Sequence, residues 1–130
     1  MNETAISASH VALRTLLLMN GGAAIALLSY DGRLPAVQAK AAAGTLLWFA
    51  LGVVTTAVAM ALTYFTHLAM AAMLSSKTRS YQRPFVSDSP RTAQLLRWKI
   101  VCHWLAAIAA TVALALFVIG VLAVRDALLK

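Results

Sequence analysis

Residues 41–76 form a run of 36 positions without a single Asp, Glu, Lys or Arg, and most of them are Ala, Leu, Val, Met or aromatic. A soluble domain does not easily bury so long an uncharged stretch, whereas ~20 apolar residues of helix cross the hydrocarbon core of a bilayer. The run is therefore long enough to span a membrane with residues to spare. It places the chain among helical integral membrane proteins and leaves the function open.

The composition agrees with this class. Of the 130 residues, 62% are hydrophobic and only 12% are charged, whereas about a quarter of the residues in a soluble domain are charged. The length allows one domain, residues 1–130, without a separate soluble module. The single cysteine, Cys102, excludes an intramolecular disulfide and a Cys-rich metal site. We expect an all-α integral membrane protein.

The hydrophobic pattern predicts three transmembrane helices, at residues 11–30, 46–70 and 100–124. The first has only 16 uncharged residues, 15–30, or ~24 Å of helix. It crosses a bilayer only if the long side chain of Arg14 reaches the headgroups. Residues 31–38, which contain an Asp-Gly pair and a proline, predict a short turn before the second helix.

Positive charge is concentrated between the second and third spans. Residues 77–99 carry one acid, Asp88, against six basic residues: Lys77, Arg79, Arg83, Arg91, Arg97 and Lys99. The positive-inside rule places this loop in the cytoplasm, so a chain with three spans has a cytoplasmic N-terminus. We expect a multi-pass protein of a bacterial-type inner membrane. Because the basic residues form one segment between apolar runs, the net charge of +7 indicates membrane orientation rather than binding of nucleic acid.

The second and third helices are expected to extend into a cytoplasmic helical hairpin. Counting ~20 residues inward from Trp48 reaches His67, and nine uncharged residues follow it up to Ser76. Ser89-Pro90 is typical of a helix start, with Ser as the N-cap and Pro at the first helical position. The third helix would then begin well before it enters lipid, after a loop of basic and polar residues. A strongly tilted helix is the alternative.

Several residues are candidates for helix–helix contacts. Helices in lipid associate by close packing and interhelical hydrogen bonds, and Asn20, in the middle of the first span, would be costly against lipid. We expect Asn20 to face a neighbouring helix. Gly21 and Gly22 either let a neighbour approach or form a packing kink. Gly52 and Thr56, four residues apart, permit close approach, either within one three-helix unit or between copies.

His67 and His103 are expected near the inner interface on adjacent antiparallel helices, with Arg14 at the same depth. Two facing imidazoles can bind haem or a transition metal, and Arg14 can bind an anionic headgroup or a quinone oxygen. In size and span count the chain resembles the membrane-anchor subunits of succinate dehydrogenase, which implies a haem and a quinone site. The His-Arg-x-Ser-Gly sequence of that family's first span is absent here. The simpler interpretation is interfacial side chains, and we expect no cofactor and no metal.

One face of the second span is a candidate pore lining. It carries residues at intervals of 4, 3, 4 and 3: Thr56, Met60, Thr63, His67 and Met70. In a homo-oligomer such a face could line a narrow polar pore; otherwise each Thr bonds its own backbone and Met fills space. Small size, three spans and a basic segment resemble holins, which implies pore formation. Holins usually carry their basic cluster in a C-terminal tail, where only Arg125 and Lys130 lie here.

No enzyme motif is present, and the four acids, Glu3, Asp31, Asp88 and Asp126, lie near chain ends or loops. We therefore expect no catalysis. The leading hypothesis is an accessory or structural subunit that associates with other membrane subunits or with its own copies. Its six basic loop residues would contact membrane lipids or an acidic cytoplasmic partner. The alternatives are a pore-forming homo-oligomer and a haem- or quinone-binding anchor.

Overall fold

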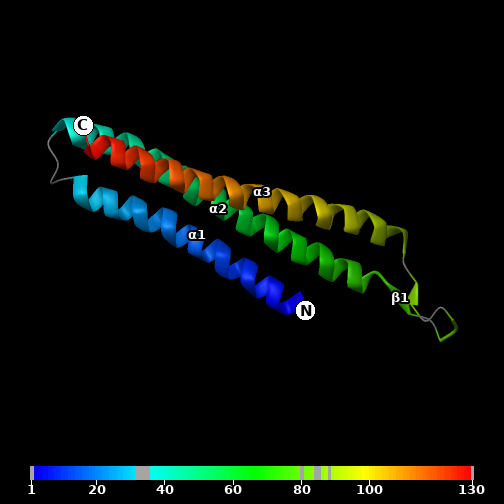
Figure 1. The fold of residues 1–130 in the computed structure, drawn as a ribbon. Helices are drawn as coiled ribbons and strands as arrows, with labels where there is room; N and C mark the ends of the chain where they lie inside the picture. The colour runs from blue at the N-terminus through cyan, green and yellow to red at the C-terminus, as the bar shows by residue number, and fades with distance from the viewer. Residues whose placement is uncertain (1, 32–35, 80, 84–85, 88, 130) are drawn as a thin grey trace.

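The computed structural model describes residues 2–31, 36–79, 81–83, 86–87 and 89–129. The chain forms three long helices and a minimal antiparallel ribbon (Figure 1): α1 (Asn2–Asp31), α2 (Ala36–Ser75), β1 (Thr78–Arg79), β2 (Val86–Ser87) and α3 (Pro90–Leu128). The predicted all-α class is confirmed.

Each helix contains a segment long and apolar enough to cross a membrane, at Ser7–Ser29, Ala43–Ser75 and Pro90–Leu128. These segments overlap the three predicted spans. At about 1.5 Å of rise per residue, the 40 residues of α2 extend ~60 Å, or twice the ~30 Å of a hydrocarbon core. The protein is a small three-span membrane protein whose second and third helices are longer than a bilayer requires.

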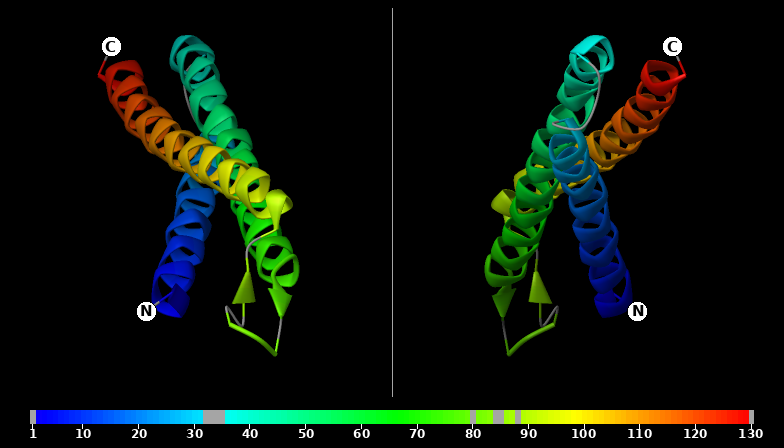
Figure 2. Two further views of the ribbon diagram at one scale, coloured as in Figure 1. Left: turned by 90° about the vertical axis from the view of Figure 1, so that its right-hand side faces the viewer. Right: turned by 90° about the vertical axis from the view of Figure 1, so that its left-hand side faces the viewer.

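The central helix is α2, which packs against α1 and α3, whereas α1 and α3 make few contacts with each other. Figure 2 shows α3 crossing α2 at a clear angle, so that the two helices separate toward the C-terminal end of α3. The bundle is therefore thin. Most of each helix surface faces outward, as expected when lipid is the solvent.

The buried residues of α2 and α3 repeat with a period of about 3.5 residues. In α2 they are Thr45, Phe49, Gly52, Thr56, Ala59 and Thr66. In α3 they are Thr92, Ala106, Ala113 and Gly120, separated by multiples of seven. Such a repeat keeps one narrow stripe of each helix buried against its neighbours, and the small residues let the backbones approach closely.

Phe49 is the large side chain of this seam. It is only 2% exposed, and its ring lies over the flat surface of Gly120 on α3. A Cβ at Gly120 would come within 2.7 Å of Phe49 Cζ. Phe117, one turn away, contacts the same ring edge-on, with ring centroids 5.9 Å apart. The pair thus fixes α2 against α3 near the C-terminal end of the bundle.

At the opposite end, α2 and α3 run past the N-terminal end of α1 and form a projecting hairpin (Figure 1). We call this part, residues 71–98, the arm. Its two helices are joined by a contact of 3.2 Å between Ser76 Oγ and Thr92 Oγ1. Thr92 Oγ1 also accepts a hydrogen bond from the backbone N–H of Ser89, over 3.2 Å. The predicted extension of both helices, and the predicted helix start at Pro90, are confirmed.

Two connections differ from the sequence-based prediction. Residues 36–38, predicted as part of a turn, already belong to α2. The alanine-rich segment that they open has high intrinsic helix propensity, so the helix extends beyond its membrane span. The predicted irregular loop of the arm contains an antiparallel ribbon that pairs Thr78 with Ser87 and Arg79 with Val86. This pairing satisfies backbone groups that a loop would leave to water.

Candidate functional site

Histidines from the three helices lie toward the arm end of the bundle, but not in the pairing predicted from the sequence. The ring of His67 on α2 stacks on that of His10 on α1, with centroids 5.7 Å apart and an interplanar angle of 22°. His103 instead packs edge-on against its neighbour Trp104, with centroids 6.4 Å apart. The predicted partner of His67 was His103; the structure gives that place to His10.

The stacked arrangement turns ring faces, rather than nitrogen lone pairs, toward each other. Two axial haem ligands instead point one nitrogen each at a common iron. Among the described residues, no group of three or more His, Cys, Asp or Glu side chains is placed to hold a metal ion. The nitrogens at the ring edges of His10 and His67 therefore suit hydrogen bonding better than shared metal coordination.

His67 and His103 do line one partly open cavity of about 420 Å³ between the three helices. The wall consists of small, apolar and hydroxyl side chains with a few cationic or imidazole groups: Ser9, Ala12, Leu13, Leu16, Thr63, Thr66, His67, Met70, Lys99, His103, Ala106, Ala107 and Ala110. Alanines on α3 leave the space that larger residues would fill. The volume lies in the range of small-molecule sites, roughly 300–1,000 Å³.

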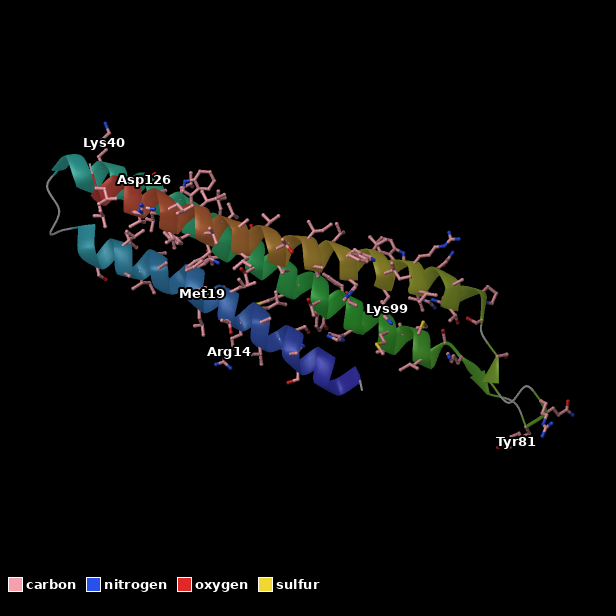
Figure 3. All side chains as sticks on the ribbon, in the orientation of Figure 1. Arg14, Met19, Lys40, Tyr81, Lys99 and Asp126 are labelled. Carbon is pink, nitrogen blue, oxygen red and sulfur yellow. The ribbon has the colours of Figure 1, made fainter. Side chains whose placement is uncertain are left out.

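Among the described residues, the cavity wall contains a cation and no acid. Lys99 is half-buried, and Figure 3 draws its side chain between α3 and α2. The Nε2 atom of His67 is buried and has no hydrogen-bond partner among the described residues. An unpaired donor or acceptor costs roughly 1–3 kcal/mol when it is withdrawn from water. Lys99 therefore has unused capacity for an anionic ligand.

Arg14 does not belong to this cavity. Its side chain is exposed and points away from α2 (Figure 3). At this position it can extend along the outside of α1 toward a headgroup, as the short first span requires. The structure therefore separates Arg14 from His67 and His103, with which the sequence interpretation grouped it.

Asn20 and Gly52 form a tight contact between α1 and α2. Asn20 is fully buried, and its Nδ2 donates to the carbonyl oxygen of Leu16 over 3.0 Å. A Cβ at Gly52 would overlap the amide of Asn20. The Oδ1 atom of Asn20 has no conventional donor among the described residues. It faces Gly52, where a Cα–H group can form a weak hydrogen bond worth ~0.5–1 kcal/mol.

The other predicted contact residues divide between the interior and the surface. Thr56 is fully buried and donates to the carbonyl oxygen of Gly52 over 2.7 Å. A Cβ at Gly21 would lie 4.0 Å from Val53, whereas nothing lies within 4 Å of a Cβ at Gly22. Asn20, Gly52 and Thr56 thus pack inside one chain, and Gly22 lies on the outer surface of α1.

The predicted pore stripe does not form one continuous exposed face. Thr56 is buried, Met60 is exposed, and Thr63, His67 and Met70 line the cavity. The hydroxyl of Thr63 donates to its own helix, to the carbonyl oxygen of Ala59 over 2.9 Å. For this face to line a pore between copies, the Thr56 side chain would have to leave the interior of its own bundle and face the pore.

The six basic residues of the loop have three different surroundings. Arg83, Arg91 and Arg97 are exposed on the arm. Tyr81 projects fully into solvent at its tip (Figure 3). Lys77 is half-buried and has a partner. Arg79 is in β1, and its side chain lies outside the described part of the structure. Lys99 lines the cavity, so the three arginines are the loop cations that are exposed among the described side chains.

Sequence reasoning missed three features of these sites. The His10–His67 stack depends on the relative height of α1 and α2, which spacing along one helix does not report. The role of Lys99 depends on which side of α3 faces α1. The sequence gives only a weak indication of the Phe49–Gly120 contact: each residue falls on the repeat of seven along its own helix.

No family model, curated protein or solved structure shows significant similarity to the chain.

Proposed function

We propose that the chain is a non-catalytic accessory subunit of an inner-membrane complex, which docks through its arm to an acidic cytoplasmic surface of another membrane subunit. The observation that carries this proposal is the arm itself. It projects beyond α1 (Figure 1) and presents Arg83, Arg91 and Arg97 at its surface. The positive-inside rule places this end of the bundle in the cytoplasm.

The arm arginines are available for a partner. None of the three makes a hydrogen bond or an ion pair within the described residues. A guanidinium offers five donors in a fixed fork that matches a carboxylate, and such charge-assisted pairs are among the stronger hydrogen bonds. Tyr81, at the tip, adds an exposed aromatic ring of the kind enriched in protein interfaces. Together these groups favour an acidic protein surface with apolar spots.

The membrane part of the chain supports association as well. Gly22 on α1 is exposed, and so is Ala26 one turn further along. Small residues four apart allow the close backbone approach by which helices associate in lipid. Since α2 covers the other side of α1, this outer face is open to a helix from another subunit.

Co-extraction in a mild detergent from the native host, analysed by native mass spectrometry, tests the proposal. The wild-type chain should leave the membrane with a larger membrane protein. Replacing Arg83, Arg91 and Arg97 together by Gln should abolish this co-extraction, whereas Arg125→Gln, at the opposite end of the bundle, should preserve it. A chain that is extracted alone or only as a homo-oligomer, or a complex that survives the triple replacement, would contradict the proposal.

A further inference from the structure

The cavity between the three helices is amphipathic along its length. Its arm end is lined by Ser9, Met70 and Lys99, and its deeper end by Leu16 and the alanines of α3. Residue numbers rise from the arm into the membrane on α1 and α3, and they fall on α2, which runs antiparallel to both. Ser9, Met70 and Lys99 therefore lie at the same end of the cavity. A polar, cationic end near the predicted inner interface thus passes into an apolar end inside the membrane.

The polar end has two groups without partners. Lys99 is half-buried, and no hydrogen bond or ion pair to it occurs within the described residues. The Nε2 atom of His67 is buried and has no hydrogen-bond partner among the described residues, and one face of its ring is covered by His10. The stack holds the imidazole in place.

These groups favour an anion over a neutral ligand. A cation drawn partly out of water is stabilised by an opposite charge, and none of the described residues that line the cavity is acidic. The lysine supplies three donors. A quinone would offer carbonyl oxygens to these donors but no charge for Lys99.

The deeper end favours a ligand with a hydrocarbon chain. Leu13, Leu16 and Ala110 form part of an apolar wall that a free phosphate ion would leave unoccupied. We propose that the cavity binds one anionic phospholipid, with the phosphate at Lys99 and the first part of an acyl chain against the apolar wall. This site is separate from the arm surface, because Lys99 lines the cavity and Arg97 is exposed.

Native mass spectrometry of the purified chain in neutral detergent tests the proposal. Phosphatidylglycerol and phosphatidylcholine with the same acyl chains are titrated separately. One phosphatidylglycerol per chain should be retained, at a concentration roughly tenfold or more below that needed for phosphatidylcholine. Inorganic phosphate at the same concentration should not displace it. Equal retention of the two lipids, or displacement by inorganic phosphate, would overturn the proposal.

Variants locate the binding to the cavity. Lys99→Gln should raise the phosphatidylglycerol concentration for half retention roughly tenfold, whereas Lys99→Arg should retain binding and Arg97→Gln should leave it unchanged. Ala110→Leu should weaken retention by filling the deeper end, and Ala115→Leu, on the exposed surface of α3, is its control. Equal losses in Lys99→Gln and Arg97→Gln would assign the lipid to the arm and refute the cavity site, even if Ala110→Leu does not fold.

Discussion

Replacing Gly52 by Ala should destabilise the bundle, although alanine is the better helix former. At Gly52 the new Cβ would overlap the amide of Asn20, which is fully buried between α1 and α2. At Gly44, on the same helix, nothing lies within 4 Å of an added Cβ. Gly44→Ala is therefore a matched control, with the same chemical change and no steric conflict.

The magnitude follows from two opposing terms. Replacing Gly by Ala inside a helix is favourable by about 1 kcal/mol, whereas forcing a methyl group into a packed contact costs about 1–3 kcal/mol. Gly44→Ala should raise the free energy of unfolding by up to about 1 kcal/mol. Gly52→Ala should leave it unchanged or lower it by up to about 2 kcal/mol.

Reversible unfolding in mixed micelles of dodecyl maltoside and SDS measures these differences. Because helices persist in SDS, the signal should report tertiary contact. Energy transfer from the tryptophans of α2 and α3 to a dye on an introduced cysteine in α1 does so, with Cys102 replaced by Ser. The two variants should differ by about 1–3 kcal/mol in the free energy of unfolding.

A double-mutant cycle assigns the effect to Asn20. Asn20→Ala removes the amide that the new methyl group would meet, so in that background Gly52→Ala should become as favourable as Gly44→Ala. The coupling energy should be about 1–3 kcal/mol. An identical effect of Gly52→Ala with and without the Asn20 side chain would refute the proposed contact, and so would equal effects of Gly52→Ala and Gly44→Ala.

Three further predictions use the same preparations. Gly120→Ala should lower the free energy of unfolding by up to about 2 kcal/mol, because its Cβ would lie 2.7 Å from Phe49 Cζ; Phe49→Leu should relieve this cost, and no relief would contradict it. Gly22→Leu should not lower the free energy of unfolding in micelles, because leucine is the better helix former, but it should abolish co-extraction of the partner; loss of stability would assign Gly22 to the chain's own packing. In a chain without Cys102, expressed in intact cells, a membrane-impermeant thiol reagent should label Lys40→Cys and not Arg83→Cys. The reverse labelling pattern would show that the predicted topology is inverted.

The fold was largely predictable because lipid imposes a simple rule on sequence. Uncharged runs of sufficient length predict the three helices, and Ser89-Pro90 predicts where α3 begins. The start of α2 at Ala36 was missed, since membrane-span patterns report where a helix meets lipid rather than where it begins. The ribbon of the arm depends on pairing between Arg79 and Val86, two residues without a strand-like hydrophobic pattern around them.

The functional surfaces were predictable only where one helix determines them. The position of Asn20 in the middle of a span sufficed to predict that its amide faces a neighbour. The pairing of His67 with His10, and the place of Lys99 in the cavity, depend on the relative height and rotation of separate helices. In lipid the relative height and rotation of helices are determined by close packing of small residues between helices. The spacing of residues within one helix does not encode them.

The most direct test of the docking role is photo-crosslinking in living cells from a photoreactive residue at position 81. Tyr81 projects from the tip of the arm, and Trp48, at the other end of the membrane segment, provides the control position. We predict one discrete adduct with another membrane protein from position 81, which is absent from position 48 and is lost when Arg83, Arg91 and Arg97 are replaced by Gln. Adducts from position 81 with lipid alone, or with further copies of this chain alone, would contradict the proposed role.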